Sequence, residues 1–358
     1  MKIYFDKKLI QHEYISFLAP LLWLPDFEIW WEDKNQIKER TEKGKTIIFS
    51  TTKKDCDYFV YPKYFLLDHW KELSEYAHEA KKHKKKVIVF SYGEIDDYIN
   101  IDNNIIWFKR STKKENPNNE YCLPPFPEDF LKYNNNNIPL IQETPSKKYS
   151  IGYVWYADYY NLRSRLYYVG TRIIWLICRI KWIKKILMKI KNDRIYSKLV
   201  NAWIGNYFRG KVIRVIKKQK KYKFNFIQRK HALTTETKNE MRKQYIENLI
   251  ESDFVLLIRW FWNYSIRQYE ALSLGKIPIY IDTWAKLPFT EDIPYDDIFI
   301  KVPIWEIEKV EIYIEKYINN HKGELQKTQK KIRFFYENFF IMTAYYKKII
   351  SMLLLKTP

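Results

Sequence analysis

The chain has 358 residues, of which 46% are hydrophobic and 18% aromatic, so it can bury a sizeable core and is not a disordered protein. Its net charge is +21, which would favour only solubility if it were spread evenly but suggests an anionic partner where it is localised. The three cysteines, Cys56, Cys122 and Cys178, are far apart, which argues against a disulfide framework and a zinc site. The first residues carry charges where a secretion signal is apolar, and no apolar run reaches the roughly 18 residues of a membrane span. We therefore expect a cytoplasmic protein.

The first half of the chain alternates between short apolar runs and a helical stretch. Strands are expected over residues 2–5, 46–49, 57–61, 86–90 and 104–108, and a helix over about 68–84. Alternation of this kind is typical of a parallel α/β sheet. The four asparagines at 134–137, followed by Pro139, are the best linker candidate. We therefore predict one domain over residues 1–138, a second over 139–330 that begins with a strand at 149–156, and a terminal helix over 331–358.

A strongly basic segment follows the first strand of the second domain. Residues 163–230 contain 21 Lys or Arg and one acidic residue, a net charge of +20, and we interpret them as a basic insertion. Within it, Thr171–Lys191 has helical periodicity, with an apolar face that includes Ile173 and lysines opposite. Three interpretations stay open: a helix on an anionic membrane surface, a nucleic-acid site with aromatic residues for stacking, and a core helix with a solvated lysine face. The nucleic-acid interpretation is the weakest of the three.

The most specific pattern lies in residues 252–289. A buried strand at 254–258 precedes a helix whose start is predicted from a capping box of Ser265 and Gln268. Gly275 ends the helix, the next strand is expected over 276–281, and Pro278 suggests either an edge strand or the first residue of a strand. Such a unit aims the free amides of a helix N-terminus at the crevice beyond the strands, where phosphates and nucleotides bind.

Two charged residues of this helix suggest a ligand. A cation in the first turn, here Arg267, is unfavourable for the helix dipole unless an anion lies nearby. Glu270, three residues on, is placed so that its carboxylate could accept two ribose hydroxyls. Taken alone, each residue also fits an ordinary structural role. Glu270 could be a surface carboxylate, Ser265 a simple helix cap, and Arg267 one half of a local ion pair.

The complete spacing resembles the C-terminal signature of the exostosin family, glycosyltransferase family 47. The matching residues are Arg259, Ser265, Arg267, Glu270, Ala271, Leu272, Gly275, Ile277, Pro278, Ile279, Asp282, Leu287, Pro288 and Phe289. Trp260 departs from the pattern, because the family usually has a glycine there. Weaker likenesses are the strand at 57–62 and Arg163, which stands three residues before Leu166 as in the family's R-x-x-L.

The resemblance implies a GT-B fold, in which two Rossmann-like domains face a cleft and the C-terminal helix packs back on the first domain. It also implies transfer of a sugar, with inversion, from a nucleotide diphosphate sugar, expected to be a UDP-sugar, to a hydroxyl of a glycan or lipid-linked glycan. The general base that such a transfer needs is assigned to Glu94, after the strand at 86–90. We expect no obligatory metal and no cofactor. The donor would be bound by Arg163, Arg259, Ser265, Arg267 and Glu270.

Two other functions stay open. The first is a fucosyltransferase-like GT-B enzyme that uses a GDP-sugar. The second is a non-catalytic protein that binds a glycan or nucleic acid. In the favoured interpretation the basic segment holds a cytoplasmic enzyme at an anionic membrane surface.

Overall fold

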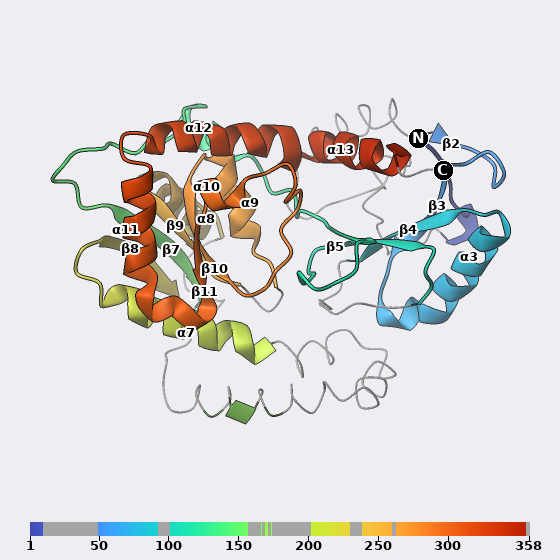
Figure 1. The fold of residues 1–358 in the computed structure, drawn as a ribbon, viewed down its shortest axis with the longest axis horizontal. Coiled ribbons are helices and arrows are strands. Elements are labelled where there is room, and N and C mark those ends of the chain that lie inside the picture. The colour runs from blue at the N-terminus through green and yellow to red at the C-terminus, as the bar shows by residue number, and fades with distance from the viewer. Residues whose placement is uncertain are drawn as a thin grey trace.

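The computed structural model describes residues 1–9, 49–91, 101–156, 166, 169–170, 173, 202–229, 238–259 and 263–355. These residues form two parallel β-sheets, one from each half of the chain, with helices packed on them (Figure 1). The architecture is mixed α/β and consistent with a Rossmann-like fold of the GT-B type. No helix in the described ranges is long and apolar enough to cross a membrane.

The first sheet has six strands, and both of its faces are buried, as expected for a parallel sheet. Its order is β2 (Phe49–Ser50), β1 (Lys2–Tyr4), β3 (Tyr58–Tyr64), β4 (Lys86–Ser91), β5 (Ile105–Lys109) and β6 (Glu120–Cys122). Alternate side chains point to opposite faces of these strands. Phe59 and Val87 pack under α3 (Trp70–Lys82), while Val60 and Ile88 pack on the other face.

The second sheet has five strands in the order β11 (Ile300–Pro303), β10 (Ile277–Asp282), β9 (Phe254–Leu257), β7 (Ser150–Tyr156) and β8 (Lys223–Arg229). Every recorded pair of these strands is parallel. The chain runs from β7 outward to β8, then returns to β9 and continues outward on the other side through β10 and β11. The strand order therefore reverses between β7 and β9, and parallel sheets bind ligands beyond the carboxyl ends of the strands at such a point.

Helices and short helical turns complete the second half. They are η3 (Phe130–Asn134), α7 (Ala202–Lys217), α8 (Lys238–Glu251), α9 (Ile266–Ser273), α10 (Tyr295–Ile298), η4 (Ile304–Lys309) and α11 (Val310–Asn320). In the first half, η1 (Lys7–Leu9) and η2 (Leu67–His69) are single turns. One large core joins buried residues of the second sheet to α7, α8, α9 and α11.

The C-terminal helices connect the two halves. α12 (Leu325–Phe335) packs in the core of the second sheet, a π-turn at η5 (Tyr336–Phe340) follows, and α13 (Met342–Leu355) crosses to the first sheet (Figure 1). Tyr345 and Ile349 of α13 are buried in the same cluster as Val60 and Ile88. The helical region expected at the end of the chain therefore packs back on the sheet of the first half.

The structure corrects the interpretation of residues 163–230 as an insertion. From 202 to 229 they form α7 and β8, and β8 pairs with β7 at seven positions. Val212 and Ile216 of α7 are fully buried, so the apolar side of this helix supports the sheet; Arg209 is buried as well, whereas Arg214 and Lys217 are exposed. Tyr222, one of the aromatic residues considered for stacking on bases, is 4% exposed and belongs to the core. Most of Thr171–Lys191 lies outside the described residues.

The edge position suggested by Pro278 is also wrong, because β10 lies between β9 and β11. Pro278 is the second residue of the strand and is paired with Val255 of β9, whereas pairing with β11 begins at Ile279. The proline thus falls where β10 still has a neighbour on one side only, so its missing N–H removes no bond to β11.

Candidate functional site

The candidate site lies at the carboxyl edge of the second sheet, where α9 begins after β9. Arg267 in the first turn of α9 is 9% exposed, and its guanidinium lies over two tyrosine rings. The distances from Cζ to the ring centroids are 5.1 Å for Tyr153 of β7 and 5.6 Å for Tyr245 of α8. Both are within the range of a cation–π interaction, so the two rings hold the guanidinium in place at the switch point between β7 and β9.

Glu270, one turn further along α9, completes this group. It is 9% exposed, and its Oε2 accepts a hydrogen bond from the Tyr245 hydroxyl. Burial raises the pKa of Glu270 above its ordinary value of 4.5, and the Tyr245 hydrogen bond and the Arg267 charge oppose this rise. A carboxylate can accept bonds at both oxygens, so Glu270 keeps capacity for a ligand hydroxyl.

Two buried polar groups beside these residues lack partners. The Tyr153 hydroxyl and the Gln268 side-chain nitrogen make no hydrogen bond within the described part of the chain, although their residues are only 2% and 3% exposed. Buried polar groups are normally paired, because leaving one unpaired costs roughly 1–3 kcal/mol. The Tyr153 ring lies under the Arg267 guanidinium and Gln268 follows Arg267 in the sequence, so both groups keep hydrogen-bonding capacity near the start of α9. Sequence reasoning missed Tyr153, which reads there as an ordinary strand residue, and Tyr245, which carries no motif.

The helix start confirms one prediction and corrects another. Ser265 is the residue before α9, as predicted, but its side chain makes no capping hydrogen bond. Only the backbone closes this turn, with the Gln268 N–H donating to the Ser265 carbonyl at 3.1 Å. The capping box is therefore not formed, which leaves the Ser265 hydroxyl and the Gln268 side chain for other partners. Gly275 ends the helix as predicted, with a φ of +66° that favours glycine.

A loop of the first sheet meets this edge of the second. Lys114, after β5, pairs with Asp282 at the end of β10 at 2.6 Å, and the Lys114 N–H donates to the Trp284 carbonyl at 3.1 Å. The N–H of Asn263, just before α9, donates to the Ser111 hydroxyl at 2.9 Å. Because Lys114 and Ser111 follow β5, these bonds bring the carboxyl ends of β5, β9 and β10 together.

A buried ion pair also holds the loop after β5 in place. Glu120 is fully buried and accepts hydrogen bonds from Lys109 at 3.1 Å, Thr112 at 2.8 Å and Asn116 at 2.6 Å. Since all three donors lie in β5 or in the loop after it, the position of the loop is determined by buried contacts.

The sequence-predicted residues are only partly placed. Arg267, Glu270 and Ser265 lie together at the start of α9, and half-buried Arg259 lies two residues after β9. Arg163 and Glu94 fall outside the described residues. Within the described ranges, no group of three or more His, Cys, Asp or Glu side chains could hold a metal ion.

Residues 180–352 match the family model of the RXYLT1 C-terminal domain. This match indicates a glycosyltransferase of the exostosin type. Its range includes the whole strand–helix–strand unit from β9 to β10 and the C-terminal helices, but neither β7 nor the first sheet. No curated protein matches the chain.

Proposed function

We propose that this chain transfers a sugar from a nucleotide diphosphate sugar to a hydroxyl of a glycan or lipid-linked glycan. The observation that carries the proposal is the buried group of Arg267, Glu270, Tyr153 and Tyr245, which lies at the strand-order reversal inside or beside the RXYLT1-like domain. It combines a cation held in place, a buried carboxylate and a hydroxyl without a partner in the described ranges. Such groups can bind the diphosphate and the hydroxyls of a nucleotide.

Each residue has a distinct role in this proposal. Arg267 neutralises the diphosphate and stabilises the charge that builds on it as the sugar leaves. A planar guanidinium presents two parallel N–H donors that match two oxygens of one phosphate, a geometry that the ammonium of a lysine does not offer. Glu270 accepts the ribose hydroxyls, and Arg259, Ser265 and Arg163 contribute further donor contacts. The amides at the start of α9 add to the positive potential.

The same fold suggests which part of the chain binds the acceptor. Residues 1–138 would form the acceptor domain and residues 139–330 the donor domain, with the terminal helix joining them. In an inverting transfer a carboxylate on the acceptor side removes the proton of the attacking hydroxyl, and we assign this role to Glu94. We propose a reaction without an obligatory metal, because the arginines carry the charge of the leaving group.

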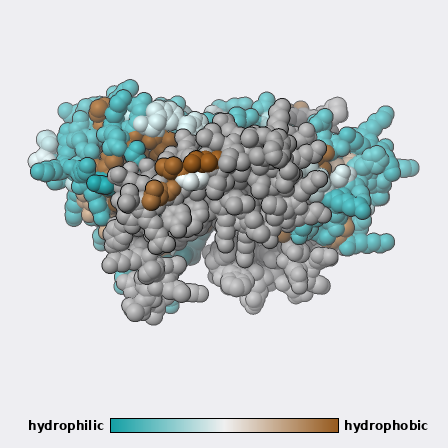
Figure 2. Space-filling view, turned by 90° about the horizontal axis from the view of Figure 1, so that it is seen from below, coloured by the Kyte–Doolittle hydropathy of each residue, from teal (hydrophilic) through white to brown (hydrophobic). Residues whose placement is uncertain are grey.

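The proposed location is a membrane surface. Leu166, Val169 and Ile173, spaced three and four residues apart, are 65%, 54% and 53% exposed. Figure 2 shows apolar residues gathered on the lower face, among residues that are not described. An apolar helix face beside a basic segment suits binding to anionic lipid. Sedimentation with anionic vesicles tests this, and a chain that stays in the supernatant at low salt contradicts it.

The experiment that tests the function is release of nucleoside diphosphate from a panel of nucleotide sugars. We expect the wild type to release UDP, and Glu270→Gln, which removes the charge and keeps the shape, to release about tenfold less or lower still. Release of GDP alone would support the fucosyltransferase-like alternative. If the wild type releases neither, while its affinity for polyanions falls steeply with salt, the proposal is wrong and a nucleic-acid-binding protein is favoured.

A further inference from the structure

Two exposed tryptophans stack on each other beyond the candidate site. Trp284 follows β10 and Trp305 lies in η4, directly after β11; their side chains are 50% and 60% exposed. The ring centroids are 5.2 Å apart and the planes are inclined by 26°. Aromatic side chains of this size normally bury most of their surface, so an exposed stacked pair indicates a binding surface.

The backbone holds both rings in place. Trp284 has a φ of +62°, in the left-handed region that is unfavourable for a bulky side chain. Its N–H donates to Asp282 Oδ1 at 2.9 Å, and its carbonyl accepts from the Lys114 N–H at 3.1 Å. Trp305 is flanked by Ile304 and Ile307, which are 6% and 0% exposed and anchor η4 to the core. The exposed rings therefore belong to a rigid surface that is maintained despite unfavourable backbone geometry.

The pair lies on the same edge of the sheet as Arg267 and Glu270. Neighbouring strands are about 4.8 Å apart, so β10 and β11 place the tryptophans about 5–10 Å from the end of β9, on the side away from β7. The Lys114–Asp282 ion pair, with Lys114 48% exposed, is bonded to the same loop as Trp284. An apolar surface thus adjoins charged hydrogen-bonding groups, next to the site assigned to the donor.

We propose that Trp284 and Trp305, which lie in the donor domain where the Lys114 loop of the acceptor domain meets it, form a platform for a pyranose ring of the acceptor glycan. A pyranose has a face of C–H bonds, which is apolar and slightly positive, and this face suits the negative face of an indole ring. Hydroxyls at the ring edge would reach Asp282 and Lys114. The inference rests on the proposed transferase function, because that function supplies a glycan acceptor at this edge.

A glycan array tests the platform. The labelled full chain is applied to neutral and acidic pyranose oligosaccharides as wild type, Trp305→Ala and Phe334→Ala. Phe334 is a matched control, because it is an exposed aromatic residue on α12, at 56% exposure. We expect the wild type to bind at least one oligosaccharide class, Trp305→Ala to bind it about tenfold more weakly or worse, and Phe334→Ala to bind it unchanged.

Nucleotide-induced thermal stabilisation of the same three proteins separates this inference from the donor site. Retained stabilisation by UDP in Trp305→Ala, with glycan binding lost, supports the platform. Unchanged glycan binding in Trp305→Ala overturns the platform and leaves the donor site standing. If no nucleotide binds but glycan binding still depends on Trp305, the platform stands and the transferase proposal fails. The platform is also overturned if the wild type binds no glycan. It is overturned as well if the vesicle sedimentation assay shows that Trp305→Ala loses only its binding to phospholipid.

Discussion

Two groups of buried polar side chains, one at each end of the strands of the second sheet, differ in how they are paired. At the amino edge, where the strands begin, Lys276 is 2% exposed and its ammonium donates to three carbonyls, those of Pro139 at 3.2 Å, Ile250 at 2.7 Å and Ser252 at 2.6 Å. Burial lowers the pKa of Lys276 to about 7, whereas the match between three N–H donors and three carbonyls favours the charged form. The group is completely satisfied from within the chain.

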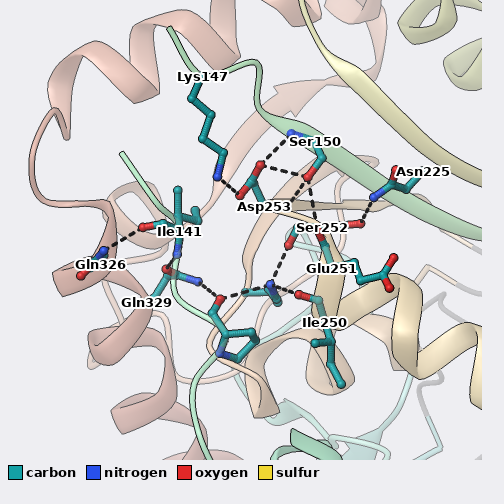
Figure 3. Close-up of polar contacts among 12 residues, drawn as sticks. Ile141, Lys147, Ser150, Asn225, Ile250, Glu251, Ser252, Asp253, Gln326 and Gln329 are labelled. Carbon is teal, nitrogen blue, oxygen red and sulfur yellow. Dashed lines mark hydrogen bonds and ion pairs between the residues drawn. The ribbon is translucent and has the colours of Figure 1, made fainter. Parts of the chain in front are cut away.

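Asp253 at the same edge is equally well paired. Its carboxylate accepts from Lys147 at 2.7 Å, from the Ser150 N–H at 2.8 Å and from the Ser150 hydroxyl at 2.9 Å (Figure 3). At the carboxyl edge, by contrast, the Tyr153 hydroxyl and the Gln268 nitrogen are buried without partners in the described ranges, and burial raises the pKa of Glu270. Lys276 and Asp253 are thus paired within the chain, whereas the residues around Arg267 keep capacity for further hydrogen bonds.

The largest expected effect comes from removing the Lys276 ammonium, whose hydrogen bonds are all made within the chain. Lys276→Met keeps much of the volume but removes the donor to three buried carbonyls, so we expect a loss of about 3 kcal/mol in the free energy of unfolding. Urea denaturation measures this. The control is Lys331→Met, which removes an ion pair with Asp297 at 3.3 Å on the surface and should cost less than about 0.5 kcal/mol. Nucleotide binding to folded Lys276→Met should be unchanged, and a parallel loss of binding would contradict the separation of the edges.

The second prediction concerns pH. A folded-state pKa above 4.5 means that folded Glu270 takes up a proton at a higher pH than unfolded Glu270. Its contribution to the free energy of unfolding therefore decreases as pH rises through the interval between the two pKa values. Ribose hydroxyls need the carboxylate, so nucleotide affinity should fall as pH drops through the raised pKa, approaching about tenfold per pH unit below it.

Calorimetric titration of UDP over a pH series checks this prediction. The affinity of Glu270→Gln should be weaker and almost independent of pH in the same interval. An equal pH dependence in the variant would show that another group titrates.

The smallest expected effect compares two hydroxyls. Tyr153→Phe removes an unpartnered hydroxyl beside Arg267, and Tyr222→Phe removes another, 4% exposed, just before β8 and so at the amino edge. Neither should lower the free energy of unfolding, because no hydrogen bond within the described ranges is lost. Tyr153→Phe should weaken UDP binding by about fivefold, the size of one hydrogen bond, whereas Tyr222→Phe should leave the dissociation constant unchanged. Equal dissociation constants for UDP in both variants would show that the Tyr153 hydroxyl does not contact the nucleotide.

The sequence is sufficient to predict much of the fold. The apolar runs at 86–90, 104–108 and 254–258 predict β4, β5 and β9 to within a residue, because fully buried parallel strands have little freedom in composition. β8 is missed because it is an edge strand with Lys223, Asn225, Gln228 and Arg229 among its residues. The helix α7 is missed as a core element because basic residues stand between the apolar ones in its sequence, so the buried Val212 and Ile216 do not form an obvious apolar run.

The site is predictable only where a motif spans it. Arg267 and Glu270 belong to one continuous pattern, so their proximity follows from helical spacing. Tyr153 and Tyr245 come from β7 and α8, more than 20 residues away from Arg267 in the sequence, and only tertiary packing brings them to it. Ser265 shows the reverse case, in which a local pattern predicts a capping bond that the folded chain does not make.

Thermal unfolding of the wild type and Glu270→Gln against UDP, GDP and their sugar conjugates tests the central claim most directly. A ligand present at about 100 times its dissociation constant should stabilise the folded protein by roughly 2.7 kcal/mol. If the carboxyl edge binds the donor nucleotide, UDP raises the melting temperature of the wild type and leaves that of Glu270→Gln nearly unchanged. Equal stabilisation of both proteins, or stabilisation of the wild type by polyanions alone, would contradict it.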